Sequence, residues 1–324
     1  MPLDRSPNTV ANTVRLFGSL AVMAIGVAAT LATVLGFLGS LWWAFDFIAG
    51  YRLQLAVLLL AVAAGFRIGF GFATGGLFLA AAITNIVIVA PLFFGSDAEA
   101  LGSAGTLTIA SVPVAEAGQQ EAMEWVEASG ADIAFLLDTD DTWAGVTPSS
   151  GSGYVTVDQV FIGRQTGVTI VARVGLDVTV AGVEGTSNPV VRAETTLGER
   201  AVVVYAMLLP SPGSNVEANL RNNLLEDIAL HINEETVPVV VIGGLGASQW
   251  SHGFRVLAEK ADLTDSSPGN GFQGSSPGHL WIGFRVPTHH LLVSDTLTTT
   301  ERHLGPDLGN GESILQGTIA FAAD

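Results

Sequence analysis

Two long stretches without a charged residue constrain the possible folds of this chain more than any other feature of its sequence. The first runs from Leu16 to Phe45 and the second from Ile68 to Ser96. An α-helix needs about 20 apolar residues to cross the hydrocarbon core of a bilayer, so each stretch is long enough for one crossing. Between them lies Leu53–Phe66, which is apolar but shorter. A snorkelling Arg52 at one end of this segment and Arg67 at the other would still let it span.

These stretches predict a membrane domain, residues 1–95, with three transmembrane helices at about residues 15–38, 50–67 and 69–94. The alternative for the first helix is a cleaved signal peptide. Its apolar stretch is longer than the roughly 7–15 residues of a signal peptide's apolar region, and two further apolar segments follow. We therefore favour a multi-pass protein of the cell membrane.

The arginines that flank these segments predict an orientation. Arg5 and Arg15 precede the first predicted span and Arg67 lies between the second and third, whereas Arg52 alone lies on the other side. Basic residues concentrate in cytoplasmic segments of membrane proteins. The N-terminus is therefore expected in the cytoplasm, and three spans would place residues 96–324 outside it, as an extracytoplasmic domain.

The charge of the chain is divided unevenly between its two parts. Residues 1–95 hold four basic and two acidic residues, whereas residues 96–324 hold nine basic and 28 acidic residues. An acidic surface repels phosphate backbones, so we expect no nucleic-acid partner. The chain has no cysteine, which excludes disulfides, thiolate chemistry and cysteine-bound zinc.

The segment that follows the membrane part is long enough for one α/β domain. Helical spacing of apolar residues predicts helices at 115–129 and 216–233, with a further amphipathic stretch after Trp250. Short strands alternating with a few helices predict packed sheets flanked by helices. The strands expected from apolar runs are 106–112, 131–139, 167–173, 200–209, 237–242, 290–294 and 313–321.

The strand at 237–242 leads into a loop, Gly243–Ser248, that carries no side chain able to do chemistry. The segments "PVVVIGG", "GASQWS", "HLLVS" and "GPDLG" resemble the endonuclease/exonuclease/phosphatase family of metal-dependent phosphodiesterases. In particular, the chain is similar to bacterial members with three N-terminal spans. The resemblance implies that residues 96–324 form a two-sheet α/β sandwich with a site at one end of the sheets.

Most positions that would carry the chemistry of that family hold other residues here. The first strand of the family ends in a metal-site Asn, where this chain has Ser111. The second strand ends in a Glu that binds a divalent metal, where this chain has the shorter Asp138. The Gly-Asp-Phe-Asn-Ala loop of the family corresponds to "GGLGA", so Gly244 replaces the Asp and Gly246 the Asn.

The last two motifs of the family are also altered. Its Asp-His pair corresponds to "HH", which puts His289 at the Asp position and keeps His290. Its final Ser-Asp-His motif corresponds to Gly311 and Glu312, at the positions of the Asp and the catalytic His. Loss of one acid, base or oxyanion stabiliser typically costs a factor of about 10² to 10⁴ in rate. The resemblance therefore implies a degenerate site with no catalytic residue.

We expect no cofactor, with one alternative. Asp138 and Glu312 are carboxylates, and with bound waters they would form a poor Mg²⁺ or Ca²⁺ site. Neighbours on a strand point to opposite faces, so His289 and His290 are not expected to share a metal ion. We expect one of the two imidazoles to be packed and the other exposed.

These observations predict a non-catalytic membrane protein, a pseudoenzyme, whose outer domain binds or scaffolds a partner. The expected partners are the lipid bilayer and other integral-membrane subunits, with this chain as an accessory subunit of a respiratory or envelope-building complex. The alternative is a metal-dependent phosphodiesterase or phosphatase with an altered site, acting on lipid or envelope phosphates. A transporter has little support, because the predicted spans contain no ion pair that would mark a transport path.

Overall fold

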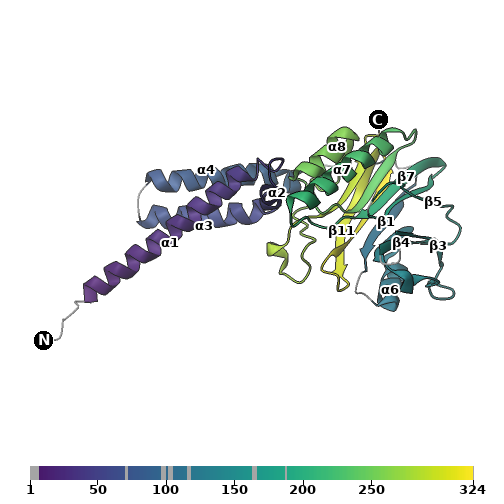
Figure 1. Cartoon of the computed structure of the whole chain (residues 1–324), viewed down its shortest axis with the longest axis horizontal. Helices are drawn as coiled ribbons and strands as arrows, with labels where there is room; N and C mark the ends of the chain where they lie inside the picture. Colours follow the sequence, from purple (N-terminus) through teal and green to yellow (C-terminus); the bar gives the residue numbers. More distant parts are fainter. Residues whose placement is uncertain are drawn as a thin grey trace. The chain divides into compact units, whose positions relative to one another are not determined.

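The computed structural model divides the chain into two compact units, Met1–Pro91 and Leu92–Asp324. Figure 1 shows both, with labels on many of their helices and strands. The structure describes residues 7–69, 72–95, 100, 105–114, 118–162, 166–186 and 188–323, with the side chains of 7–15, 66–69 and 72–74 left outside the description.

The first unit is helical, and three of its helices pack around a small apolar core. Gly26 lies at the contact, because a Cβ atom there would come within 2.7 Å of both Phe78 and Val62. The core consists of Ala29, Leu59, Val62, Ala63, Phe78 and Ala82. The helices are α1 Pro7–Leu35, α2 Trp43–Ala49, α3 Arg52–Gly69 and α4 Phe72–Val89, and the short α5, Pro91–Phe94, follows at the junction of the two units.

The described residues contain one helix that alone is long and apolar enough to cross a membrane, the Leu16–Leu35 part of α1. A second span results only if α2 and the Arg52–Gly65 part of α3, which meet at 72°, count as one broken span. The apolar part of α4, Gly75–Val89, is shorter. Three separate spans at 15–38, 50–67 and 69–94 are therefore not supported. Breaks between helices divide the apolar stretches, and a helix such as α1 fits a signal sequence as well as a span.

Arg52 does not snorkel, because its side chain is only 2% exposed inside the helical unit. Its Nη1 atom donates hydrogen bonds to Thr33 O at 2.9 Å and to Asn85 Oδ1 at 3.3 Å. The guanidinium carbon also lies 4.3 Å from the centre of the Phe37 ring. A buried charge needs such partners to offset its lost hydration. Asp46, within α2, is likewise buried.

The second unit contains two six-stranded sheets in the part of the chain that is described. The first has the order β11-β12-β1-β2-β4-β3 and the second has the order β5-β6-β7-β8-β10-β9. The strands of the first sheet are β1 Leu107–Pro113, β2 Ile133–Thr139, β3 Tyr154–Ile162, β4 Thr166–Arg173, β11 Leu297–Asp307 and β12 Ser313–Phe321. Those of the second are β5 Thr179–Gly182, β6 Val190–Leu197, β7 Arg200–Leu208, β8 Val239–Gly244, β9 Leu263–Asp265 and β10 His289–Ser294.

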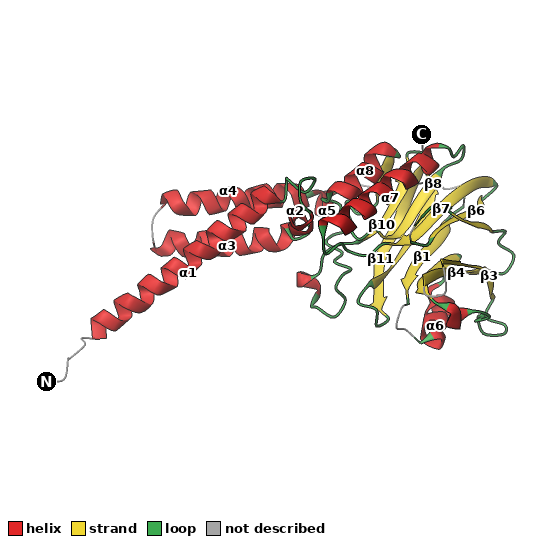
Figure 2. Cartoon of the chain, in the orientation of Figure 1, coloured by secondary structure: helices red, strands yellow, loops and turns green. Residues whose placement is uncertain are grey.

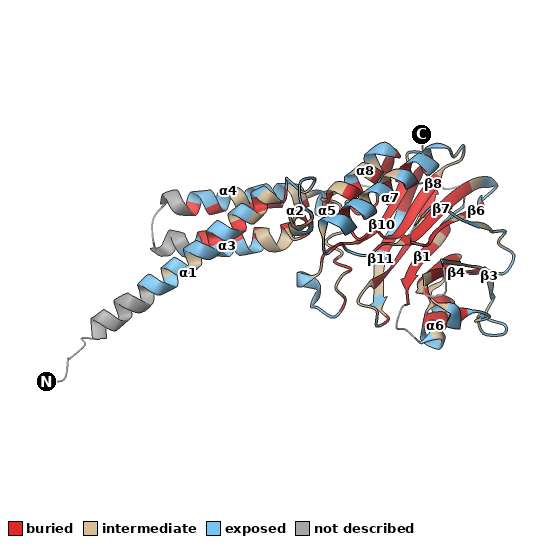
Figure 3. Ribbon diagram, in the orientation of Figure 1, coloured by how far each residue is buried: buried red, intermediate tan, exposed pale blue. Residues whose placement is uncertain are grey.

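The two sheets pack face to face, with helices against their outer faces (Figure 2). Helix α6, Gln119–Ser129, covers the first sheet, and α7, Asn215–Asn233, and α8, His252–Lys260, cover the second. Side-chain alternation builds the layers, since Leu291 faces the core between the sheets while Leu292 faces the helices. Figure 3 shows the result: the central strands are buried, whereas the helices that cover them also carry exposed residues.

Every strand expected from an apolar run is present, with ends shifted by at most two residues. The helices at 216–233 and after Trp250 are also present, and α6 begins at Gln119. Five strands were not expected: β3, β5, β6, β9 and β11. Four of these are the edges of their sheets. Edge strands are partly solvated and carry polar residues, so they lack the continuous apolar run of a central strand.

Candidate functional site

Strand pairing brings most of the positions singled out in the sequence to one end of the sandwich. Ser111 of β1 pairs with Leu315, close to the start of β12, and Gly244 at the end of β8 pairs with His289 at the start of β10. A hydrogen bond from His289 Nδ1 to Ser313 O, 2.6 Å long, links β10 to β12 and thus one sheet to the other. The loop that carries Glu312 directly precedes β12.

The imidazole of His289 occupies the space next to Gly244. A Cβ atom at Gly244 would lie 2.6 Å from His289 Nε2 and 2.4 Å from Leu208 Cδ1. No real side chain makes contacts this close without displacing its neighbours. His289 is fully buried, so its ring fits here only because residue 244 has no side chain. Where the resemblance expects a carboxylate, the structure holds an imidazole from the neighbouring strand.

His289 is neutral at neutral pH. Burial lowers the pKa of its imidazole, and the nearby Glu312 carboxylate opposes this only in part. Because the carbonyl of Ser313 can only accept, Nδ1 carries the proton. Nε2 then has a lone pair, lies 3.7 Å from Glu312 Oε2 and makes no hydrogen bond. The ring is therefore a packed neutral group and not a charged partner of the carboxylate.

His290 points away from His289, into the layer between the second sheet and its helices. Its Nε2 lies 2.7 Å from Ala247 O, and its ring packs 4.5 Å from that of Phe254 on α8. Burial lowers its pKa to about 4. The two imidazoles thus lie on opposite faces of β10, but both are buried. The expectation that one is exposed was wrong, because α8 covers the outer face of the sheet.

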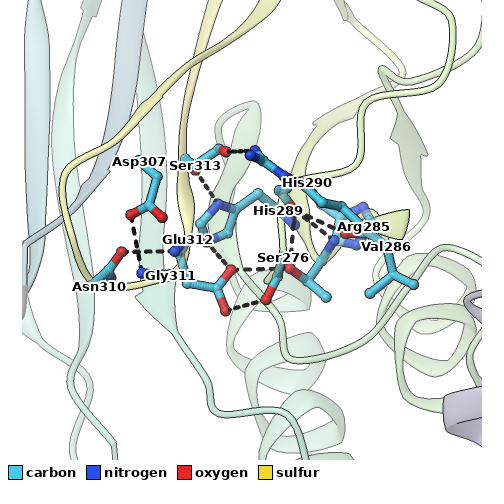
Figure 4. A network of polar contacts seen from close by, with 12 residues as sticks. Ser276, Arg285, Val286, His289, His290, Asp307, Asn310, Gly311, Glu312 and Ser313 are labelled. Atoms are coloured by element: carbon cyan, nitrogen blue, oxygen red, sulfur yellow. Dashed lines mark hydrogen bonds and ion pairs between the residues drawn. The ribbon is translucent and has the colours of Figure 1, made fainter. Parts of the chain in front are cut away.

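The carboxylate of Glu312 is held by two hydroxyl groups. Oε1 accepts a hydrogen bond from Ser276 Oγ at 2.9 Å, and Oε2 accepts one from Thr288 Oγ1 at 3.2 Å (Figure 4). Gly311, with φ of 82°, turns the chain just before it, and its N–H donates to Asp307 Oδ1. Sequence reasoning missed both hydroxyl donors. They lie 36 and 24 residues from Glu312, and nothing in the sequence predicts that pairing.

The remaining singled-out positions do not join this network among the described contacts. Asp138 is the last residue but one of β2 and lies at a bulge, with a positive φ of 68°, which is uncommon for a residue other than glycine. Partial burial raises the pKa of its carboxyl, and the charge of Asp140 adds to this. Ser111 is fully buried and its hydroxyl makes no hydrogen bond. Gly246 has φ of 58°, and a Cβ atom there would lie 2.3 Å from Pro210 O.

These residues do not fit the divalent cation that the fold family implies. Ca²⁺ takes about six to eight oxygen ligands, and Mg²⁺ keeps several waters beside one or two carboxylates whose oxygens are free to bind it. The described part of the chain contains no group of three or more His, Asp or Glu side chains that could hold a metal ion. Both oxygens of Glu312 already accept hydrogen bonds from hydroxyl groups, and the His289 ring fills the space at Gly244.

Two surface pockets lie elsewhere in the second unit. One, of about 340 Å³, is lined by residues just after β7, among them Leu209 and Pro210, and by residues of α7 such as Leu220. The other, of about 300 Å³, is lined by Glu184, Asp227 and their neighbours. Neither is lined by any of the eight positions singled out in the sequence.

The sequence matches no protein-family profile, and no curated protein matches it at a significant level. Solved structures match by fold. An AP endonuclease from Archaeoglobus fulgidus is 13% identical with a TM-score of 0.52, and the match covers 67% of this chain and all of that one. D. rerio TDP2 complexed with a single-strand DNA product is 13% identical with a TM-score of 0.52, covering 66% and 98%. The human Nocturnin catalytic domain is 13% identical with a TM-score of 0.51, covering 67% and 95%.

At this identity the likeness shows the fold alone. Neighbours of this kind belong to the endonuclease/exonuclease/phosphatase family, and the second unit has the two-sheet α/β sandwich of that family. The two-sheet sandwich expected for the second unit is confirmed. The chemistry of this chain is a separate question, which its own residues must answer.

Restoring the family's acid in the loop should destabilise the protein. In Gly244→Asp the new side chain meets the buried His289 ring and Leu208, and its charge has no partner, so we expect a loss of about 3 kcal/mol or more. This corresponds to a fall of about 6–12 °C in melting temperature. Thermal unfolding of the full chain in detergent measures it.

The matched control is Gly118→Asp. Gly118 precedes α6 as its N-cap, with an ordinary φ of −61°, and a Cβ atom added there would have no other atom within 4 Å. Asp is favoured at an N-cap, so the control should be neutral or slightly stabilised. Equal stability of the two variants would mean that the His289 ring does not fill the space next to Gly244.

Proposed function

We propose that this chain is a non-catalytic membrane protein whose outer unit, the sandwich, binds or scaffolds a partner within a larger membrane complex. The packing of the His289 ring into the space next to Gly244 is the observation that carries the proposal. On this proposal, the chain's own side chains close the cleft that would take a reacting phosphate and its metal, while the sandwich itself is intact.

The polar groups near Gly244 also support a non-catalytic role. Phosphodiester hydrolysis needs a base for the attacking water and positive charge to stabilise the phosphoryl group. His289 uses Nδ1 to bind Ser313 O and is neutral, and His290 is buried on the other face of its strand. Glu312 adds negative charge where the resemblance expects a histidine. Each group has a structural partner in place of a catalytic one.

The proposed membrane arrangement keeps three crossings, by α1, by α3 with α2, and by α4, with the N-terminus in the cytoplasm. The basis of this proposal is the three apolar stretches of the sequence and their flanking arginines. The helices themselves give one clear span, and a second if α2 and α3 form one broken span. The outer unit would then lie outside the cytoplasm. Its proposed partners are other integral-membrane subunits of a respiratory or envelope-building assembly.

A second candidate is a metal-dependent phosphodiesterase or phosphatase with an altered site, acting on lipid or envelope phosphates. The observation in its favour is the fold, which is shared with an AP endonuclease from Archaeoglobus fulgidus. Asp138 and Glu312 would be its metal ligands. The acidic surface of the outer unit disfavours a nucleic-acid substrate.

Purification of the full chain from its native membrane in mild detergent tests these alternatives. We expect a constant membrane-protein partner at fixed stoichiometry. We also expect no more hydrolysis of bis-(p-nitrophenyl) phosphate with Mg²⁺ or Mn²⁺ than for the Asp138→Ala variant. Metal-dependent turnover that Asp138→Ala abolishes would contradict the scaffold proposal and favour the second candidate.

The topology has its own test. A reporter that is active only in the cytoplasm, fused after Asp324, should give no signal, because three crossings from a cytoplasmic N-terminus end outside. A strong signal would overturn either the number of crossings or the orientation. A second fusion after Gly39, in the segment after α1, distinguishes the two: it should be silent if the orientation is right.

A further inference from the structure

The outer unit presents a cluster of large apolar side chains to solvent. The residues 277–285, which we name the aromatic loop, expose 72% of Trp281 and 60% of Phe284, together with Leu280 and Ile282. The Trp281 and Phe284 rings contact each other edge to face, with centroids 5.9 Å apart. A contiguous exposed patch of this kind marks an interaction surface more often than four scattered side chains would.

Hydrogen bonds fix the shape of the aromatic loop. Ser276 and Val286 pair at its base, with N–O distances of 2.7 and 3.1 Å. Within it, Arg285 Nε donates to Leu280 O at 2.7 Å, and a 3₁₀ turn covers Ile282–Phe284. The backbone of the loop therefore holds its apolar side chains outward.

Glu312 anchors the same base. Its carboxylate accepts hydrogen bonds from Ser276, just before the loop, and from Thr288, just after it (Figure 4). Gly278 N, inside the loop, also donates to Gly311 O at 2.6 Å. The segment that replaces the family's catalytic motif thus supports the aromatic loop.

The charge pattern around the loop points to a lipid surface. Residues 266–294 contain no Asp or Glu and form the longest acid-free stretch of a region that holds 28 acidic residues. Elsewhere the acidic unit would be repelled by anionic lipid headgroups. Trp and Phe with a neighbouring Arg285 are the residues that favour the interface between headgroups and acyl chains.

The position of the loop in the chain points the same way. Leu92 and Gly95 lie at the start of this unit and follow the apolar helix α4 within a few residues. Gly271 N donates to Leu92 O at 2.7 Å, and the backbone of Gly95 packs so closely on Pro268 that a Cβ atom would lie 2.5 Å away. The segment that leads into the aromatic loop is therefore bound to the segment that leaves the apolar helices.

We infer that the aromatic loop inserts Trp281, Ile282 and Phe284 into the surface of the bilayer that holds the apolar helices. This rests on the membrane attachment proposed above. The insertion adds a second contact with the membrane and fixes how the outer unit faces its partners. The proposed binding partner of the aromatic loop is lipid. Binding of a protein to the loop is the alternative that the experiment must distinguish from it.

The absence of cysteine makes a direct test possible, because any cysteine introduced is the sole thiol. Trp281→Cys in the full chain is labelled with the fluorophore NBD and reconstituted into phosphatidylcholine/phosphatidylglycerol vesicles. The control is Val174→Cys, an exposed apolar residue just after β4, at the opposite end of the sheet from Glu312. Lipids with bromine or nitroxide on the acyl chains then quench only labels that enter the bilayer.

We expect at least twofold stronger quenching at position 281 than at position 174, together with blue-shifted NBD emission. Phe284→Cys serves as a second reporter, and a melting temperature close to that of the unmodified chain shows that each variant folds. If the protein floats with the vesicles but shows equal, low quenching at both positions, the insertion of the aromatic loop is wrong, whereas the membrane attachment still holds. If the protein does not float with the vesicles, both the insertion and the membrane attachment are wrong.

Discussion

The contact between the His289 ring and Gly244 determines what this end of the sandwich can do. Gly244 has no side chain, so the imidazole of the neighbouring strand fills the space, and its Nδ1–H reaches Ser313 O on the other sheet. One side chain thereby occupies the space beside Gly244 and joins the two sheets. A carboxylate at position 244 would require the ring to leave, and with it the link between β10 and β12.

Glu312, at the same end of the sandwich, also has a structural role. A glutamate at a position where the resemblance expects a catalytic histidine has its carboxylate held by Ser276 and Thr288. Those hydroxyls stand on either side of the aromatic loop. A position expected to serve catalysis therefore supports a surface feature. On the proposal made above, the fold has been kept while its open end has changed from a reaction centre to a scaffold for a membrane-facing loop.

The sequence predicted the parts of the fold that depend on local pattern. Central strands such as β8 were visible as apolar runs, and α7 was visible from its helical spacing. Edge strands were not visible as apolar runs, because one side of each faces water. The three expected spans were reduced to one clear candidate, since composition does not show where a helix breaks. The partners of Glu312 were also invisible, because hydrogen bonds across many residues depend on the finished fold.

The claim that the cleft is closed to a divalent metal can be measured directly. Mn²⁺ is titrated into the full chain and free Mn²⁺ is followed by electron paramagnetic resonance, beside the Asp138→Asn/Glu312→Gln variant. An acidic surface binds some Mn²⁺ non-specifically, and the variant corrects for this. A closed cleft predicts the same binding curve for both chains. A single stoichiometric Mn²⁺ site that is present in the unmodified chain and lost in the variant would contradict it.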